Sequence, residues 1–324
     1  MPGISTSMLL AASAIQHARA ADDVIAQCHA MLARACLERA GASGRRLLRI
    51  VDTGWGRALL AVLERLLLPG LSAHYLWRKR RIRHWALQAC DARIRQVLIL
   101  GAGFDGLGLT LLDHRRDLRV FELERPATMQ IKRAALQALG LERPQLSLIG
   151  VELGGAAPPG LQELQGFDAD RPTLVIAEGV LMYLTRHEVI HMLQQLAQAL
   201  PGGRLIATAM ARRTDGHPGF HRQHRLVRHW LRWRGEPFQW GTDKTGLATL
   251  LHTGQVDFRR VADPDEATDP DPSPGEWVFA GAFVQQGQPF SAPLTEREIA
   301  SGRRRASASA SERAAAEPVR TPGS

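Results

Sequence analysis

Short apolar runs alternate with longer amphipathic stretches through the middle of the chain. The runs are five to seven residues long and end in polar or glycine residues, which is typical of strands. We expect these strands at residues 96–100, 118–123, 146–151, 173–177 and 204–210. Residues 125–139 and 186–200 carry apolar side chains at helical spacing, and the second stretch stops at Pro201-Gly202-Gly203. Alternating strands and helices indicate an α/β fold whose parallel sheet is covered by helices on both faces.

The order of elements changes toward the C-terminus. A helix over 245–251 leads to a strand over 256–261, an acidic, proline-rich turn over 263–276 and a last strand over 277–284. Two strands joined by a turn predict an antiparallel pair at one edge of the sheet. Residues 287–324 hold almost no large apolar side chains, so burial cannot offset the entropy of ordering them, and we expect a disordered tail there.

Residues 1–95 are expected to form a helical cap in front of a core domain over 96–286. One helical segment is expected to run from the apolar residues around Met8 through Cys28 to Leu37. The start of this segment faintly resembles a signal peptide with a small-residue cleavage site at 18–20. No Lys or Arg precedes the apolar run, however, and the run is short, so we interpret it as part of the cap.

Composition and charge limit the partners. No run of about 18 apolar residues predicts a membrane-spanning helix. Forty-one Lys and Arg against 32 Asp and Glu give a net charge of +9, and only three of the basic residues are lysines. In an alanine-rich chain we interpret this arginine excess as a compositional bias, and we expect neither a nucleic-acid nor a membrane partner. Three cysteines, Cys28, Cys36 and Cys90, exclude a disulfide framework and suit the cytoplasm.

A glycine-rich loop follows the first predicted strand directly. Gly101, Gly103 and Gly106 have G-x-G-x-x-G spacing, and glycines there let the backbone and the next helix N-terminus approach a ligand closely. The second strand ends in Glu122-Leu123-Glu124, about 20 residues on, where an acid can bind two ribose hydroxyls. The loop and the acids together predict a nucleoside-cofactor site, but NAD and S-adenosylmethionine sites share this pattern.

Four ordered segments distinguish the two cofactors. They are His74-Tyr75-Leu76-Trp77-Arg78-Lys79, the run 97–105, the run 120–126 followed by Lys132, and the run 166–184 with its Ala177-Glu178-Gly179-Val180-Leu181-Met182-Tyr183-Leu184. With these segments the chain resembles the leucine carboxyl methyltransferase family over about residues 70–285. The resemblance is to bacterial members of unassigned substrate. It implies a class I methyltransferase with a Rossmann-like seven-stranded sheet, mostly parallel with an antiparallel terminal hairpin, and S-adenosyl-L-methionine as cofactor.

The resemblance also implies roles for single residues. The cofactor-binding positions are Arg78, Gly101, Gly103, Asp105, Glu122, Glu124, Glu152, Leu153 and Glu178. Arg78 matches an arginine that binds the methionine carboxylate of the cofactor, since a planar guanidinium suits a carboxylate. Glu124 matches the ribose-binding acid, usually an aspartate, and Glu122 can share its task. The pair Glu152-Leu153 matches positions near the adenine, and Glu178 matches the acid beside the reacting end.

The acceptor is expected to be a small molecule or peptide, methylated on a carboxylate or another oxygen. A carboxylate is already ionised at neutral pH and needs no general base, so the site mainly has to align the reactants. Tyr183 is the candidate catalytic residue that would orient the acceptor. An insertion over 212–240, with seven arginines beside Asp215 and apolar residues at helical spacing from Phe220 to Leu231, is the expected substrate lid and would attract an anionic acceptor.

Other functions stay open at this point. His217 and His221 lie four residues apart near one predicted helix, but suitable further ligands are lacking, and we expect no metal site. An RNA or protein methyltransferase would use the arginine surfaces. An NAD(P)-dependent oxidoreductase would use a Tyr-x-x-x-Lys pair, but Tyr75 and Lys79 precede the glycine loop. A catalytically degenerate protein is compatible with Gly106, where the family usually has threonine.

Overall fold

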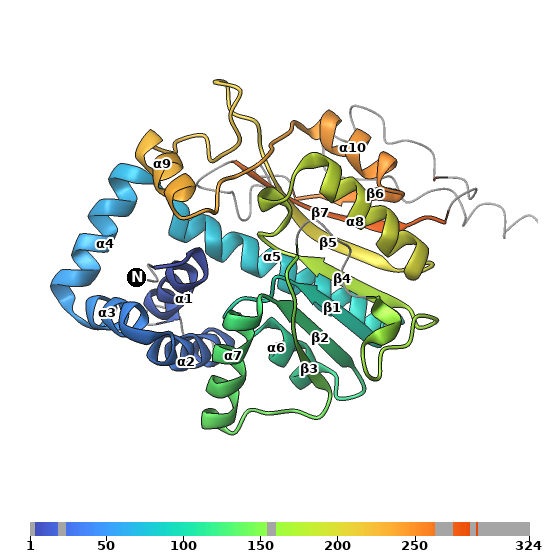
Figure 1. The fold of residues 1–324 in the computed structure, drawn as a ribbon, viewed down its shortest axis with the longest axis horizontal. Coiled ribbons are helices and arrows are strands. Elements are labelled where there is room, and N and C mark those ends of the chain that lie inside the picture. Colours follow the sequence, from blue (N-terminus) through green and yellow to red (C-terminus); the bar gives the residue numbers. More distant parts are fainter. Residues whose placement is uncertain (1–3, 19–23, 154–159, 263–274, 286–289, 291–324) are drawn as a thin grey trace, which may run out of the picture.

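Seven strands form one sheet in the order β3-β2-β1-β4-β5-β7-β6 (Figure 1). The computed structural model describes residues 4–18, 24–153, 160–262, 275–285 and 290. The strands are β1 (Gln96–Leu100), β2 (Arg119–Glu124), β3 (Leu146–Gly150), β4 (Thr173–Ala177), β5 (Arg204–Met210), β6 (Val256–Val261) and β7 (Glu276–Phe283). Strands β1 to β5 are parallel, and β7 runs antiparallel between β5 and β6. The expected α/β class and the antiparallel pair at one edge are confirmed.

Helices cover both faces of the sheet. On one face α5 (Leu71–Ala92) and α6 (Leu107–His114) pack against Val97 and Ile99 of β1. On the other face α8 (Arg186–Ala199) and α10 (Lys244–Thr253) belong to the same apolar cluster as Leu98 and Leu100. Every residue of β1 and β4 is buried, because alternate side chains point to opposite, helix-covered faces. This is why these strands read as continuous apolar runs.

Local signals in the sequence set the ends of the helices. Pro126 occupies the first turn of α7 (Pro126–Leu139), and Gly140 ends that helix with a φ of +63°. Thr185 and Glu188 form a reciprocal capping box at the start of α8. A 3₁₀ turn, η2 (Leu181–Tyr183), lies between β4 and α8, and a second one is η1 (Leu161–Glu163).

The N-terminal cap consists of α1 (Thr6–Ala18), α2 (Val24–Arg39), α3 (Gly41–Asp52) and α4 (Gly54–Leu67). The expected single helical segment from Met8 to Leu37 is therefore wrong, because two helices pack against each other over a shared apolar core. Short side chains such as Ala11 and Ala12 are buried in that core and allow the helices to approach. Residues 19–23, between the two helices, lie outside the described part of the chain.

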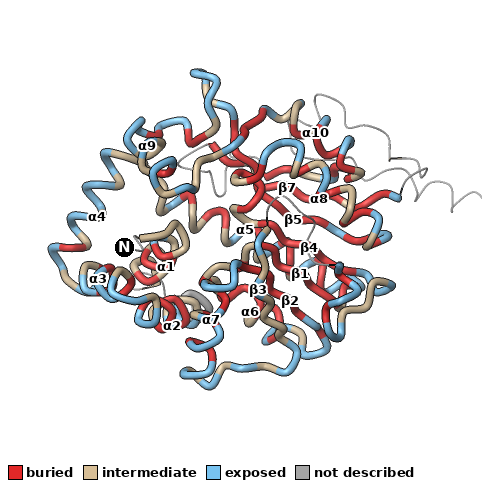
Figure 2. Tube along the Cα trace, viewed as in Figure 1, coloured by how far each residue is buried: buried red, intermediate tan, exposed pale blue. Residues whose placement is uncertain are grey.

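Helix α4 lies at the periphery of the molecule, and its trace is mostly exposed, unlike the buried strands (Figure 2). Within the described residues, no single helix is long and apolar enough to cross a membrane. The pair α4 and α5 passes that test together by length and composition, but the two helices meet at an angle of 89°, and α5 is packed against the sheet.

The insertion between β5 and α10 differs in detail from the expectation. Its helix, α9 (Arg225–Trp233), begins only after Phe220, which is buried against Met182 and Met210 instead of lying on a helical face. Of the histidines expected on or near one helix, His229 lies on α9, and His224 caps its start. The earlier part of the insertion pairs with neighbouring backbone, for example Arg212 with Pro218 in an isolated bridge.

Candidate active site

The structure brings all ten residues expected from the sequence to one cavity of about 400 Å³. The strand order reverses between β1 and β4, which are neighbours in the sheet but not in the sequence. The cavity lies at this topological switch point, where ligands usually bind in open α/β sheets. The ten residues are Arg78, Gly101, Gly103, Asp105, Glu122, Glu124, Glu152, Leu153, Glu178 and Tyr183. Helices α1 and α2 and the insertion complete the wall of this cavity.

The glycine loop is closed by hydrogen bonds within the protein. The amide of Gly101 donates to the carbonyl of Leu123 at 2.8 Å, and the amide of Gly103 donates to Glu124 Oε2 at 2.9 Å. Gly101 has a φ of +67°, and a Cβ there would lie 2.3 Å from the Val180 side chain, so both conformation and space require glycine. Asp105 accepts a hydrogen bond from the amide of Leu107 and thereby occupies the N-terminus of α6.

The two acids at the end of β2 have different surroundings. Glu124 is bound to the glycine loop and also accepts a hydrogen bond from the amide of Arg125 at 2.9 Å. Glu122 forms an ion pair with Lys132 of α7 at 2.5 Å, and both side chains are almost fully buried. Glu124 therefore stabilises the glycine loop at the edge of the cavity, whereas the charge of Glu122 is neutralised by Lys132.

A chain of buried charges forms one side of the cavity. Arg78 of α5 donates from Nε to Glu178 Oε1 at 2.9 Å and from Nη1 to Glu276 Oε2 at 2.7 Å. His74, one turn earlier, donates from Nε2 to the same oxygen of Glu276 at 2.8 Å. Lys79 pairs with Glu178 Oε2 at 2.9 Å and with Asp105. The chain links α5, the glycine loop, the end of β4 and the start of β7.

These contacts keep the buried carboxylates ionised. Burial alone would raise the pKa of Glu276, but the Arg78 guanidinium and the bond from His74 outweigh it and lower that pKa to about 2. Burial likewise opposes ionisation of Glu178, while Lys79 and Arg78 lower its pKa. Burial raises the pKa of Tyr183 to about 12, so this phenol stays neutral at physiological pH.

Four further site residues were not assigned from the sequence, three of them in the chain of buried charges. Glu276 belonged to the expected acidic turn, but β7 begins one residue earlier than expected and pairs Glu276 with Met210 of β5. His74 and Lys79 lay within a segment that carried the family resemblance. The i, i+4 spacing of His74 to Arg78 on one helix was an available signal, whereas the i, i+1 spacing of Lys79 to Arg78 was not.

The far end of the cavity joins the cap to the insertion. Glu236 accepts hydrogen bonds from the amide and hydroxyl of Thr6 at 3.2 and 2.5 Å, and it pairs with Arg125 Nη2 at 3.1 Å. Tyr183 lies close to Phe238, with ring centroids 5.8 Å apart. Glu236 is thus an acid of the insertion that the sequence reading passed over, and it fastens α1 across the cavity.

The side of the cavity toward the cap and the insertion is mainly apolar. Its apolar lining consists of Leu9, Leu10, Leu68, Leu71, Met182, Phe220, Val227, Trp230, Leu231 and Phe238. None of the seven arginines of the insertion is among the described lining residues. The expectation that the basic insertion attracts an anionic acceptor therefore has no support in the lining of the cavity.

The cavity is strongly acidic although the chain is basic. Seven carboxylates line it, against the lining cations Arg78, Lys79 and Arg125 and Lys132, which pairs with Glu122, whereas the whole chain has a net charge of +9. Such an arrangement focuses a negative potential inside a low-dielectric cleft. The cavity is therefore suited to a ligand with net positive charge.

The sheet order, the glycine loop and the acid at the end of β2 together define a class I methyltransferase fold. The model of the leucine carboxyl methyltransferase family matches residues 9–197. Because this match covers more than half of the chain, the protein belongs to the leucine carboxyl methyltransferase family, as the sequence segments predicted.

Individual relatives agree with this assignment. A protein of Mycolicibacterium paratuberculosis named "Putative S-adenosyl-L-methionine-dependent methyltransferase" is 31% identical over 177 residues, 54% of this chain and 56% of the relative. One of the same name from Mycolicibacterium vanbaalenii is 35% identical over 128 residues, 39% and 40% of the two chains. The chain thus matches about half the length of these curated relatives. A crystal structure described as "a putative methyltransferase from Thermobifida fusca" shares the fold, with a TM-score of 0.52, 19% identity and coverage of 72% and 90%.

Proposed function

We propose that this protein is an S-adenosylmethionine-dependent O-methyltransferase. The observation that carries the proposal is the acidic cavity around a closed glycine loop. S-adenosylmethionine carries a sulfonium and an ammonium against one carboxylate, whereas NAD carries two phosphates. Seven lining carboxylates favour the cation. The relatives' names and the family membership support the same cofactor.

The hydrogen bonds of the loop argue against a dinucleotide. A pyrophosphate binds to free amides of the glycine loop and to the N-terminus of the following helix. Here the amides of Gly101 and Gly103 donate to Leu123 and Glu124, and Asp105 occupies the N-terminus of α6. The protein's own anions take the positions that phosphates would need.

Within this proposal several of the predicted residues have individual roles. Glu124 would accept hydrogen bonds from the ribose hydroxyls, and Arg78 with Lys79 would bind the methionine carboxylate. Glu178 would accept from the ammonium group, and Glu152-Leu153 would contact the adenine side. Arg78 uses Nε and Nη1 for its two glutamates, so among the groups described its Nη2 remains to donate a single charge-assisted hydrogen bond to a carboxylate.

The acceptor is proposed to be an apolar small molecule or a peptide end that presents a carboxylate. The two acids whose charges act on Tyr183 are Glu236 and Glu276, and like Glu178 they have lowered pKa values and are weak bases. The histidine in the lining, His29, is bound to Thr110 at 2.8 Å on the side of the glycine loop. A site without a strong base suits an acceptor that is already ionised at neutral pH.

The chemistry then needs alignment more than proton transfer. Held by Arg78, Glu124 and Glu178, S-adenosylmethionine would supply the methyl group. A carboxylate oxygen of the acceptor would bond to the methyl carbon, and the carbon–sulfur electron pair would remain on sulfur. The neutral Tyr183 hydroxyl would donate a hydrogen bond that orients the acceptor, and the apolar lining from the insertion would exclude water. The unpaired Cys28, Cys36 and Cys90 suit the proposed cytoplasmic location.

Calorimetry tests the cofactor. S-adenosylmethionine and S-adenosylhomocysteine should bind to the full chain, and NAD and NADP should not. Glu124→Ala should weaken binding by about 10- to 100-fold, because a hydrogen bond to a charged group is lost, while Glu142→Ala, an exposed residue away from the cavity, should not. Binding of NAD would overturn the proposal, and binding of neither cofactor would favour a catalytically degenerate protein.

A transfer assay tests the acceptor class. With methyl-labelled S-adenosylmethionine, apolar carboxylic acids should be converted to base-labile methyl esters. Matched phenols, which would need a base, should react far more slowly at neutral pH. Turnover of phenols alone, or of RNA, would refute the carboxylate assignment while leaving the cofactor assignment intact.

A further inference from the structure

Helix α4 carries an apolar stripe on its exposed side. Trp55, Leu59, Val62, Leu63 and Leu66 recur at i, i+4, i+7, i+8 and i+11, which places them on one face of the helix. All five are exposed, Trp55 by 68% and Leu66 by 66%, and the only buried residue of the helix is Gly56. A stable helix in water normally turns such a stripe inward, so its exposure indicates a binding surface.

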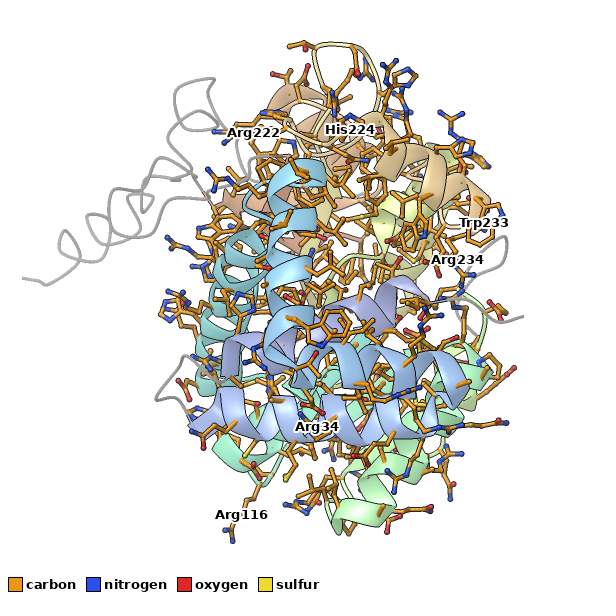
Figure 3. The ribbon with its side chains drawn as sticks, turned by 90° about the vertical axis from the view of Figure 1, so that its left-hand side faces the viewer. Arg34, Arg116, Arg222, His224, Trp233 and Arg234 are labelled. Atoms are coloured by element: carbon orange, nitrogen blue, oxygen red, sulfur yellow. The ribbon has the colours of Figure 1, made fainter. Side chains whose placement is uncertain are left out.

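The stripe continues onto α9. Leu226 and Trp233 lie seven residues apart on one side of α9 and are exposed by 59% and 74%. The amide of His224, the cap of α9, donates to the carbonyl of Leu67 at 2.9 Å, which joins the start of α9 to the end of α4. Figure 3 looks directly at this side of the molecule, with α4 in the foreground and Trp233 at its edge.

Exposed apolar side chains are concentrated here. Of nine large apolar side chains exposed in the described part of the molecule, seven belong to these two helices; the others are Leu9 and Met31. We call the seven residues the α4–α9 face: Trp55, Leu59, Val62, Leu63, Leu66, Leu226 and Trp233.

The helices that carry or adjoin the α4–α9 face are rich in arginine. Helices α3, α4 and α9 hold Arg45, Arg46, Arg49, Arg57, Arg65, Arg225, Arg228 and Arg232. The acids of the same helices are Asp52, which pairs with Arg34, and Glu64, which accepts from Ser72. On α9 the arginines recur at i, i+3 and i+7 in a row beside Leu226 and Trp233, without a single acid.

This charge pattern selects among occupants. A second copy of the chain would bring two arginine-rich surfaces together, and like charges in contact disfavour such a dimer. The undescribed residues 291–324 hold six arginines against four glutamates and only three large apolar residues, Leu294, Ile299 and Val319, so their composition does not complement the face. The face is also built on the outer side of helices, whereas a specific peptide would need a groove.

We propose that the α4–α9 face docks this protein peripherally on an anionic lipid surface. Tryptophans suit the boundary between headgroups and acyl chains, and arginines beside them suit anionic headgroups. The sequence expectation of no membrane partner considered only spanning helices. Some lining residues of the cavity belong to the same region: Leu68 and Leu71 follow α4, and Val227 and Trp230 lie on α9. Docking would place these four residues between the lipid surface and the cavity.

Vesicle flotation of the full chain tests the docking. The protein should float with vesicles of phosphatidylcholine and phosphatidylglycerol and stay unbound with phosphatidylcholine alone. Leu59→Ser combined with Leu66→Ser should lower the lipid affinity by at least about tenfold, because apolar area no longer enters the interface. Met31→Ser, a similarly exposed residue outside the face, should leave binding unchanged.

Charge and folding are tested separately. Replacing Arg225 or Arg232 with Gln should weaken binding to the anionic vesicles by about fivefold each. Added salt should reduce the difference in affinity between each variant and the wild type. All variants should keep the wild-type melting temperature and S-adenosylhomocysteine affinity, because the substituted residues lie outside the cavity. Equal binding to neutral vesicles, no binding to either, or a dimer that Leu59→Ser/Leu66→Ser dissociates would each overturn the proposal.

Discussion

Glu276→Gln is the sharpest single perturbation of the buried charge chain. The side chain of Glu276 is fully buried, receives the Arg78 guanidinium at 2.7 Å and receives His74 at 2.8 Å. Glutamine keeps the size and shape of the side chain but removes the charge. The substitution therefore leaves the Arg78 cation buried with one remaining carboxylate partner, Glu178.

The magnitude follows from the pKa of Glu276. A pKa lowered from 4.5 to about 2 corresponds to about 3 kcal/mol of stabilisation at neutral pH. Loss of one partner from a buried ion pair costs a similar amount, about 3–5 kcal/mol. We expect the melting temperature at pH 7 to fall by roughly 5–10 °C.

The pH dependence has a definite sign. Because the pKa of Glu276 is lower in the folded state, its contribution is complete above about pH 4.5 and is lost as the pH falls toward about 2. The assay is thermal unfolding followed by circular dichroism for wild type and Glu276→Gln between pH 7 and pH 3. The difference in melting temperature between wild type and Glu276→Gln should become smaller only below about pH 4.5.

Asp117→Asn is the matched control, since Asp117 pairs with Arg115 and Arg95 on the surface. An exposed pair contributes about 0–1 kcal/mol, so this variant should melt close to wild type. The reasoning is refuted if Glu276→Gln also melts within about 1 °C of wild type at pH 7. If the difference in melting temperature between wild type and Glu276→Gln is the same at pH 3 as at pH 7, the lost stability comes from packing and not from the charge of Glu276.

Three more predictions follow from the site. Arg78→Lys should weaken S-adenosylhomocysteine binding by about 10- to 100-fold in calorimetry but leave 5′-methylthioadenosine, which lacks the carboxylate, unaffected. Glu236→Gln should raise the dissociation rate of S-adenosylhomocysteine in stopped flow by about tenfold, because one charge-assisted contact to Thr6 and Arg125 is weakened; an unchanged rate would show that the contact does not retain the ligand. Lys132→Met should cost about 3–5 kcal/mol in urea unfolding, and adding Glu122→Leu should recover most of it.

Most of the strands were predictable because they are buried on both faces of the sheet. The expected boundaries of β1, β4, β5 and β6 match the structure, and those of β2, β3 and β7 differ by one residue at an end or at both. A strand buried on both faces is an apolar run bounded by Gly, Pro or charged residues, and these signals are local. The acids of β2 and the glycines after β1 were predictable for the same reason, because they lie at or directly after the end of a strand.

Pairs distant in sequence were not predictable in this way. Glu276 meets Arg78 across 198 residues, and Glu236 meets Thr6 across 230. The periodicity of a segment indicates which face of a helix or strand is apolar. It does not indicate which charged side chains of two distant elements form an ion pair. The insertion shows the same limit: its apolar and basic rows were both visible, but the spacing alone did not tell that Trp230 lines the cavity while Trp233 lies on the outer surface.

The net charge of +9 conceals an opposite charge inside. Arginines lie mainly on the surface, and acids gather around the cavity. The two sets act over different ranges, because solvent and salt screen the outer arginines within about 8–10 Å, while the enclosed acids act in a low-dielectric space. Under the proposed function this separation also favours an order of binding. An acceptor carboxylate meets repulsion from the empty acidic cavity, and the cationic methyl donor removes part of that repulsion once it is bound, so donor before acceptor is the sequence that the charges favour.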